Sequence, residues 1–329
     1  MLDKFNREIN YLRVSITDRC NLHCSYCRPK EGISLQGHDD ILRYEEIIRI
    51  VSVAVKMGLV KVRVTGGEPL VRRGFVNFIA ALKNINGLND ISLTTNGILL
   101  EEFARDIFDA GICRINISLD SLNKDKYCRI TNGGNLDAVL RGIARAEKIG
   151  FFPIKINTVA IKGFNDDELL DFAQLAVNKP FQVRFIELMP VGQANSGYSE
   201  DYMPATQIIK KISERYELEQ VKDKKNKSDG PAKIFKIKGG CGEIGFINPV
   251  SDHFCSTCNR LRLTSDGKLR VCLLKEDEID FKKALRENCS DTELENLIRE
   301  AILLKPKEHD LVCTESTLKK CRNMSAIGG

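Results

Sequence analysis

Strand-like and helix-like segments alternate from residue 11 to about residue 188, and this alternation restricts the fold more than any other feature of the sequence. The strand-like runs lie at residues 11–16, 60–65, 91–95, 114–119, 154–161 and 183–188. Segments with apolar residues at helical spacing lie at 44–57, 75–85, 99–110, 136–149 and 167–177. Repeated strand-then-helix units form a parallel sheet covered by helices. Six units are fewer than the eight that close a full barrel. We therefore predict an α/β fold with an incomplete, three-quarter parallel TIM-like β/α barrel.

The character of the chain changes after residue 190. A helix capped by Thr206 is predicted at 206–216, followed by a charged run at 222–229 that suits a solvated loop. Short strands are predicted at 232–237, 243–247, 260–264 and 269–273, and helices at 281–286 and 291–304. The turn at 265–268 joins the last two strands as a hairpin. We predict two domains: a barrel over residues 1–190, and a C-terminal region over 191–329.

Three cysteines, Cys20, Cys24 and Cys27, follow the first predicted strand at CxxxCxxC spacing. An ordinary [4Fe–4S] site takes four cysteines. Three thiolates on one short loop hold three irons and leave the fourth iron open to a small molecule. The alternative is a zinc site with His23 as the fourth ligand. The aromatic Tyr26 before the last cysteine favours the cluster, because this pattern resembles the signature of the radical S-adenosylmethionine superfamily.

A second triplet, Cys255, Cys258 and Cys272, lies in the C-terminal region, again without a fourth cysteine at ligand spacing. Cys258 and Cys272 flank the predicted hairpin, whose ends could bring them together. One alternative is a structural zinc site with Cys241, or less readily Cys289, as fourth ligand. With three cysteines alone, a second open iron could hold a substrate atom.

Cations recur on the predicted strands. Arg260 and Arg262 share one face of a strand because side chains alternate along it, and two guanidiniums suit a phosphate-bearing ligand. Other basic residues lie on strands of the barrel: Arg13, Lys61, Arg63, Lys155 and Arg184. An isolated buried cation would pair with a carboxylate, but several like charges repel unless an anion joins them. We therefore expect a polyanionic ligand in the barrel.

The N-terminus is polar, and no apolar run approaches the ~20 residues of a membrane span. These features favour a cytoplasmic protein without a membrane partner. The net charge of +5 does not demand nucleic acid. In a reducing compartment, cysteines outside the two triplets are expected to be free thiols. They are Cys113, Cys128, Cys241, Cys289, Cys313 and Cys321.

With both triplets, the chain resembles the GTP 3′,8-cyclase family of molybdenum-cofactor biosynthesis. The resemblance runs almost end to end. It includes YLRVSITDRCNLHCSYCRP, VRVTGGEPLVR, LTTNG, RINISLDSL, IKINTVAIKGFNDDEL, RFIELMPVG, PVSDHFCSTCNRLRLTSDGKLRVCLL and the terminal MSAIGG.

This resemblance implies a role for each matching residue. Each cysteine triplet would hold one [4Fe–4S] cluster. The contacts to S-adenosylmethionine would be Tyr26, Gly67, Ser118 and Met189. The contacts to GTP would be Arg13, Arg63, Thr94, Lys155, Arg260 and Arg262, with Lys61 and Arg184 as weaker candidates. The terminal Gly328 and Gly329 would reach the active site and be needed for turnover. The histidines are expected to have local structural roles: His23, His38, His253 and His309.

The resemblance also implies a reaction. Reduced flavodoxin or ferredoxin would supply an electron, and cleavage of S-adenosylmethionine would give a 5′-deoxyadenosyl radical. That radical would take the hydrogen from C3′ of GTP, the C3′ radical would attack C8 of guanine, and the product radical would then be reduced. The family is commonly dimeric, so a homodimer is possible. The rivals are a radical enzyme that modifies peptides and a two-cluster electron carrier. Binding of GTP would distinguish the cyclase from the carrier.

Overall fold

The computed structural model describes residues 1–28, 35–191, 198–221, 230–309 and 324–328. Its centre is a row of parallel strands that follow one another in the sequence and in space. They are β1 (Tyr11–Ser15), β2 (Lys61–Thr65), β3 (Asp90–Thr95), β4 (Ile115–Ser118), β5 (Ile154–Ala160) and β6 (Gln182–Glu187). Each pairs in parallel with the next. The predicted parallel β/α architecture is thereby confirmed.

The parallel part of the sheet is wider than the six strands that we predicted. On one side β10 (Arg260–Leu263) pairs in parallel with β1, and on the other β9 (Glu243–Ile247) pairs in parallel with β6. These two strands lie outside the regular alternation of strand and helix from which the six units were predicted. The sheet is therefore continuous across residue 190.

Antiparallel strands extend both edges. β11 (Lys268–Arg270) and β12 (Glu278–Asp280) follow β10, so the predicted hairpin at 265–268 is confirmed. β8 (Lys233–Ile237) and β7 (Leu218–Gln220) follow β9. Within the described residues, the strand order begins at β12 and ends at β7 without a pairing between them, as in an open barrel.

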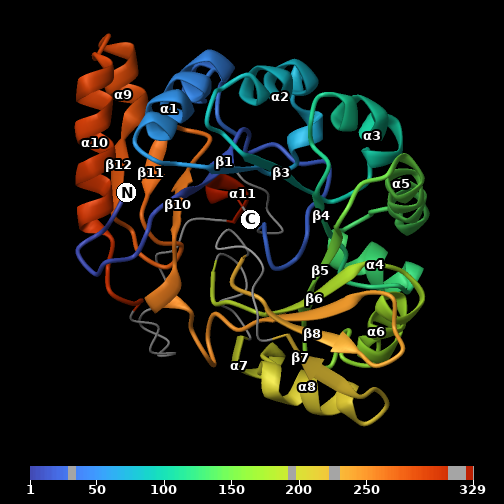
Figure 1. Ribbon diagram of the computed structural model, residues 1–329. Coiled ribbons are helices and arrows are strands. Elements are labelled where there is room, and N and C mark those ends of the chain that lie inside the picture. Colours follow the sequence, from blue (N-terminus) through green and yellow to red (C-terminus); the bar gives the residue numbers. More distant parts are fainter. Residues whose placement is uncertain (29–34, 192–197, 222–229, 310–323, 329) are drawn as a thin grey trace.

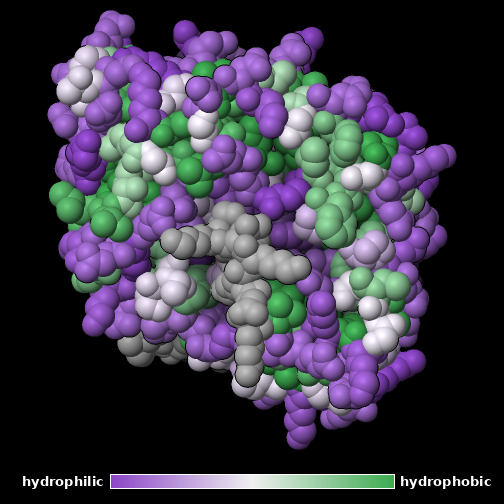
Figure 2. All heavy atoms as spheres, viewed as in Figure 1, coloured by the Kyte–Doolittle hydropathy of each residue, from purple (hydrophilic) through white to green (hydrophobic). Residues whose placement is uncertain are grey.

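Helices cover the outside of the curved sheet (Figure 1). They are α1 (Tyr44–Lys56), α2 (Phe75–Lys83), α3 (Leu100–Asp109), α4 (Lys124–Thr131), α5 (Leu136–Ile149), α6 (Leu169–Asn178), α8 (Ala205–Ser213), α9 (Phe281–Arg286) and α10 (Asp291–Leu304). Shorter helical turns are His38–Asp40, Pro69–Val71, Cys255–Thr257, α7 (Tyr198–Asp201) and α11 (Met324–Ile327). In Figure 2, hydrophilic residues are spread over the outer rim with hydrophobic patches between them.

The alternation of side chains along the strands decides what faces the helices and what faces the barrel interior. On β1, Leu12 and Val14 are buried in the hydrophobic core. Arg13, between them, faces the opposite way and lines a cavity. The same division applies to Val62 and Val64 around Arg63 on β2. The apolar face thus stabilises the sheet against its helices, and the polar face is left for a ligand.

Some local expectations differ from the structure. α4 was not predicted, although Asn123 is its N-cap and accepts hydrogen bonds from the backbone of Asp125 and Lys126. Thr206 is not a cap, because α8 begins one residue earlier with Pro204 at its N-cap. The charged run 222–229 lies outside the described residues. Among those that are described, no helix is both long and apolar enough to cross a bilayer.

Candidate active site

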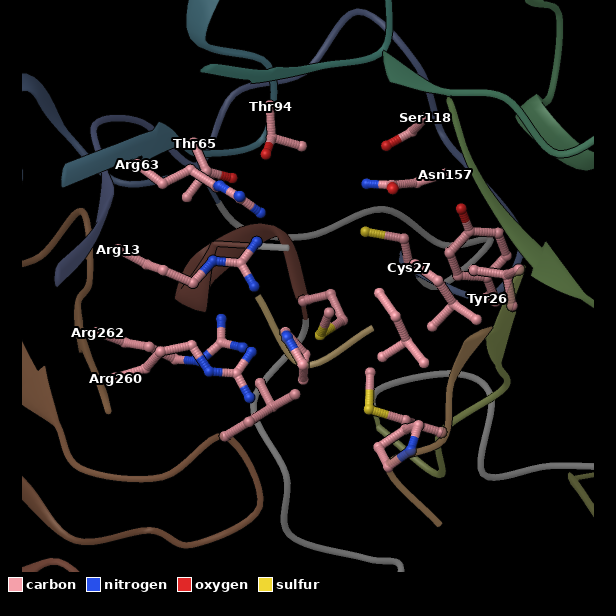
Figure 3. Close-up of a pocket in the computed structure, with 18 of the residues that line it drawn as sticks. Arg13, Tyr26, Cys27, Arg63, Thr65, Thr94, Ser118, Asn157, Arg260 and Arg262 are labelled. Carbon is pink, nitrogen blue, oxygen red and sulfur yellow. The ribbon is translucent and has the colours of Figure 1, made fainter. Parts of the chain in front are cut away.

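A cavity of about 300 Å³ opens inside the barrel, and both cysteine triplets line it. Figure 3 shows its two contrasting sides. The guanidiniums of Arg13, Arg63, Arg260 and Arg262 converge on one side, and Tyr26, Cys27, Ser118 and Asn157 lie on the other. The strands thus place a cationic wall opposite the loop that carries the first triplet.

The first triplet lies on the loop after β1. A backbone turn shapes this loop, because the amides of Cys27 and Arg28 both donate to the carbonyl of Cys24. Burial raises the pKa of the Cys20 and Cys24 thiols. A bound metal reverses that preference by deprotonating a coordinating thiol.

The sulfur of Cys20 already has hydrogen-bond donors in place. It accepts from the backbone amide of Leu22 at 3.4 Å and from the side-chain amide of Asn96 at 3.7 Å. Such donors suit sulfur bound to iron, where they tune the cluster. Three cysteines outside any disulfide on one cavity wall, with donors to the sulfur of Cys20, suit an iron–sulfur cluster.

The GGEP motif, residues 66–69, is hydrogen-bonded to the residues that lead into the cysteine loop. The amide of Gly67 donates to the carbonyl of Thr17 at 2.6 Å, and that of Glu68 to Arg19 at 2.8 Å. A Cβ atom on Gly67 would collide with the backbone of Asp18 and Arg19. Glycine is therefore required here for the approach of the chain to itself, in addition to any cofactor contact.

Glu68 is fully buried and ties the loop to β3. Its carboxylate accepts from the backbone of Leu70 and Asn96 at 3.0 and 2.7 Å, and from the Thr95 hydroxyl at 2.9 Å. Burial raises its pKa to about 7 despite these donors. The carboxylate thus connects the GGEP motif with the TTNG motif.

Tyr26 anchors the other end of the cysteine loop. Its hydroxyl donates to Asp120 at 2.7 Å, and Asp120 also accepts from the amide of Val159 at 2.8 Å. Burial raises the pKa of Asp120 to about 6, although both hydrogen bonds oppose the shift. Ser118 at the end of β4 and Met189 after β6 line the same cavity.

The cationic wall is a row across adjacent strands. Arg13 on β1 is in register with Arg63 on β2 and with Arg262 on β10. Burial and the nearby Arg63 and Arg260 lower the pKa of Arg13 to about 10, so it stays protonated near neutral pH. Burial, Arg13 and Arg260 likewise lower the pKa of Arg262. Concentrated buried positive charge of this kind favours an anionic ligand.

Two buried polar atoms in the wall of the cavity are available to bind a ligand. The Thr94 hydroxyl and the Asn157 side-chain oxygen are buried, and neither has a hydrogen-bond partner among the described residues. Both residues line the cavity. A buried polar atom left without a partner costs about 1–3 kcal/mol, which a bound polar ligand would recover.

Not every predicted cation reaches the cavity. Arg184 lines it, and its side chain donates to Gln182 at 2.6 Å. Lys155 is buried but is not among the described residues that line the cavity. Lys61 lies on β2 two residues before Arg63, and its ammonium is 3.0 Å from the carboxylate of Asp90.

The pairing of Lys61 leads to a prediction about stability. Lys61→Met should lower the free energy of unfolding by about 1–3 kcal/mol, because it removes a buried partner of Asp90. Arg114 also pairs with Asp90 and limits the loss. Anaerobic denaturant unfolding measures this effect, and calorimetry should find GTP affinity unchanged. A large loss of GTP affinity at unchanged stability would contradict this assignment.

The second triplet surrounds the β10–β11 hairpin as predicted. Cys255 lies in a short helical turn, Cys258 precedes β10 and Cys272 follows β11. Burial alone would raise the pKa of Cys258, but the positive charges of Arg260 and Lys305 outweigh it and the pKa falls to about 6. A thiolate is the form that binds metal.

The candidate fourth cysteines lie elsewhere. Cys241 is exposed, and its amide donates to Val177 at the end of α6. Cys289 is near Arg49 and Asp291. Among the described cysteines, only those of the two triplets line the cavity.

The end of the described chain enters the barrel. Met324 lines the cavity, and the guanidinium of Arg262 donates to the carbonyl of Gly328 at 2.6 Å. Gly328 is buried with φ +77° beside Ser15 and Thr65. Gly329 lies outside the described residues.

Several cavity residues were not singled out from the sequence. Thr65, Asp120 and Asn157 each lie two positions beyond a chosen residue, namely Arg63, Ser118 and Lys155. The two-residue period of a strand was the signal for them. His253 and His309 also line the cavity, with their rings 5.2 Å apart. No spacing in the sequence connects those two histidines.

A parallel β/α barrel with a cysteine triplet after its first strand defines a radical S-adenosylmethionine protein. In agreement, residues 14–176 match the model of the Radical SAM superfamily, and residues 181–311 match Molybdenum Cofactor Synthesis C. Among solved structures, Streptococcus suis SuiB bound to the precursor peptide SuiA aligns with a TM-score of 0.58 and 14% identity. The alignment covers 98% of this chain and 75% of that one, which shows a shared fold.

Curated relatives define the family more narrowly. The GTP 3′,8-cyclases of Moorella thermoacetica, Alkaliphilus oremlandii and Pelotomaculum thermopropionicum are 51%, 48% and 47% identical to this chain. Each alignment covers 100% of this chain and of the relative. The chain belongs to the GTP 3′,8-cyclase family.

Proposed function

We propose that this protein converts GTP to (8S)-3′,8-cyclo-7,8-dihydroguanosine 5′-triphosphate, the first step of molybdenum-cofactor biosynthesis. One observation carries the proposal: a single cavity is lined by two cysteine triplets and by the arginine row. An electron carrier needs no such cavity. The similarity to SuiB, at 14% identity, concerns the fold and does not favour a peptide substrate.

The residues present fit two [4Fe–4S] clusters and S-adenosylmethionine. Cys20, Cys24 and Cys27 would hold one cluster, and the second triplet the other. The contacts to S-adenosylmethionine would be Tyr26, Gly67, Ser118 and Met189. With the first cluster reduced, bound S-adenosylmethionine would supply the 5′-deoxyadenosyl radical that takes the C3′ hydrogen of GTP. Asp120, by holding Tyr26, and Glu68, by holding the GGEP motif, keep that wall in place.

The arginine wall would bind the triphosphate. Arg13, Arg63, Arg260 and Arg262 offer planar donors that suit phosphate oxygens. Thr94 would donate or accept with its unpartnered hydroxyl. Lys155 was also predicted to contact GTP, but it is not among the described residues that line this cavity. Holding C3′ and C8 of one substrate close together supplies much of the rate enhancement. The walls of the cavity would also limit the access of water to the reacting atoms.

Further parts of the proposal concern partners and location. A cytoplasmic enzyme of this type would take electrons from flavodoxin or ferredoxin and would act without nucleic acid or a membrane partner. A homodimer is consistent with the proposal. Sedimentation of the anaerobic protein measures its oligomeric state directly.

The test of the reaction is anaerobic. The reconstituted protein is mixed with GTP, S-adenosylmethionine and dithionite, and the products are separated by mass spectrometry. We expect 5′-deoxyadenosine together with a cyclised isomer of GTP of unchanged mass. Deoxyadenosine without any change in GTP would contradict the substrate. Absence of both products, with about eight irons per chain as two clusters require, would contradict the reaction.

A further inference from the structure

Two buried cations contact the backbone around the second cysteine triplet without lining the cavity. They are Arg7, close to the N-terminus, and Lys305, one residue after α10. Lys305 is 2% exposed and Arg7 is 7% exposed. Burying a charge in this way costs free energy unless hydrogen bonds or opposite charges compensate it.

Lys305 connects the two strands of the hairpin that separates Cys258 from Cys272. Its ammonium donates to the carbonyl of Arg260 at 2.8 Å and to the carbonyl of Val271 at 2.7 Å. Val271 directly precedes Cys272, and Arg260 is two residues after Cys258. The ammonium also interacts electrostatically with the thiols of both cysteines.

Arg7 acts on the third cysteine. Its guanidinium donates to the carbonyl of Cys255 at 2.8 Å, and to the carbonyls of Lys307 and Pro306 at 3.0 and 2.6 Å. Asp3, whose side chain is fully buried, orients the guanidinium through a contact of 2.6 Å. The N-terminal segment and the segment after α10 are thus joined at this triplet.

The two cations have the same geometric relation to the triplet. Each donates to a carbonyl oxygen of a cysteine or of a residue within two positions of one, and each comes from a segment outside the triplet's own loop and hairpin. Three thiolates carry negative charge, and reduction of a cluster adds one more. Nearby positive charge favours the reduced form, because net charge and hydrogen bonding set the potential of such clusters. A residue that only stabilised the fold would not change the reduction potential of the cluster.

We propose that Arg7 and Lys305 are positioning residues of the second cluster: they fix the backbone that carries its three cysteines and favour its reduced state. This proposal rests on the proposed function, which assigns a [4Fe–4S] cluster to Cys255, Cys258 and Cys272. It adds two residues from outside every motif of the sequence.

The experiment measures the second cluster by itself. A background with Cys20, Cys24 and Cys27 changed to alanine removes the first cluster, and potentiometric electron paramagnetic resonance then reports the remaining one. In this background Lys305→Met should shift the equilibrium about tenfold towards the oxidised cluster, which is about 59 mV for one electron. Arg7→Met should act in the same direction. Loss of iron from this site in a natively folded protein would also support the positioning role.

The chain offers a matched control two residues away. Lys307 is exposed, so Lys307→Met removes the same charge without removing a buried contact and should leave the potential unchanged. Lys305→Arg keeps the charge and can still donate, so it should keep the potential near that of the parent. If Lys305→Met does not fold, Arg7→Met and Lys305→Arg carry the test.

The outcomes separate the two proposals. Full iron content and an unchanged potential in Lys305→Met and Arg7→Met would overturn the inference and leave the proposed function intact. An equal shift in Lys307→Met would also overturn it. If the parent background binds no [4Fe–4S] cluster, or binds zinc, the proposed function fails first.

Discussion

Replacing Gly328 with alanine should lower the rate of GTP cyclisation by about 100-fold, as expected when a small displacement disturbs a positioned site. Gly328 has φ +77°, a conformation that L side chains rarely adopt. A Cβ atom there would lie 2.8 Å from the methyl of Thr65 and 3.1 Å from Cβ of Ser15. The end of the chain would have to move away from Arg262, whose guanidinium now donates to the Gly328 carbonyl.

Iron content and binding of S-adenosylmethionine should stay at parental levels in this variant, because the collision at Gly328 involves the barrel wall at Ser15 and Thr65 and neither cysteine loop. Deleting residues 328 and 329 should likewise abolish cyclisation while both clusters assemble. The measurement is single-turnover product formation with iron analysis of the same sample. Full activity in the truncated protein would contradict the role of the tail.

Gly163→Ala is a matched control for the backbone effect. Gly163 has φ +72°, and no atom of the described residues lies within 4 Å of the place that a Cβ atom would take, so alanine there meets strain but no collision. Activity should remain close to that of the parent. An equal loss in both variants would show that backbone strain alone, and not the contact at the barrel wall, explains the effect.

The order of the central strands could be predicted from the sequence because strand and helix alternate there without interruption. β9 and β10 were predicted as strands, but their parallel pairing with β6 and β1 was not, because other segments separate them from these partners in sequence. β10 pairs with β1, about 250 residues earlier, through a contact that no local pattern encodes. That pairing is what brings Arg262 beside Arg13. The cationic row is therefore a product of the long-range topology, although each arginine was recognisable alone.

The site shows the same limit at the level of single residues. Cysteines at short spacing can be recognised in the sequence as a metal or cluster site, because few other functions need three thiols on one loop. Lys61 and Arg63 look equivalent in the sequence, being on one face of one strand. Only the depth within the barrel separates them: Lys61 reaches Asp90, while Arg63 lines the cavity. Depth depends on the stagger of neighbouring strands, which periodicity does not report.

Replacing Arg13 with methionine should weaken GTP binding by about 10- to 100-fold. A hydrogen bond to a charged group contributes about 1.5–3 kcal/mol, and about 1.4 kcal/mol corresponds to tenfold in affinity. Arg13 is the middle member of the row, in register with Arg63 and Arg262. Its loss therefore removes charge from the centre of the anion site.

In the protein without GTP, replacing Arg13 should affect the free energy of unfolding less than a mutation that breaks a buried contact. Removing Arg13 relieves repulsion from Arg63 and Arg260, which now helps to lower its pKa. The free energy of unfolding should therefore fall less than in Lys61→Met, where a buried ion pair is broken. The two variants should separate affinity from stability: one loses GTP binding, and the other loses stability.

Anaerobic calorimetry of the protein with both clusters measures the affinity, with guanosine as a second ligand. If Arg13 contacts the triphosphate, its replacement should weaken GTP far more than guanosine. Arg73→Met, at an exposed position before α2, controls for the change in net charge and should bind GTP like the parent. Equal weakening of GTP and guanosine would instead assign Arg13 to the purine, and unchanged GTP affinity would exclude it from the site. The first result is expected because a polyanion offsets the repulsion within a row of three neighbouring guanidiniums.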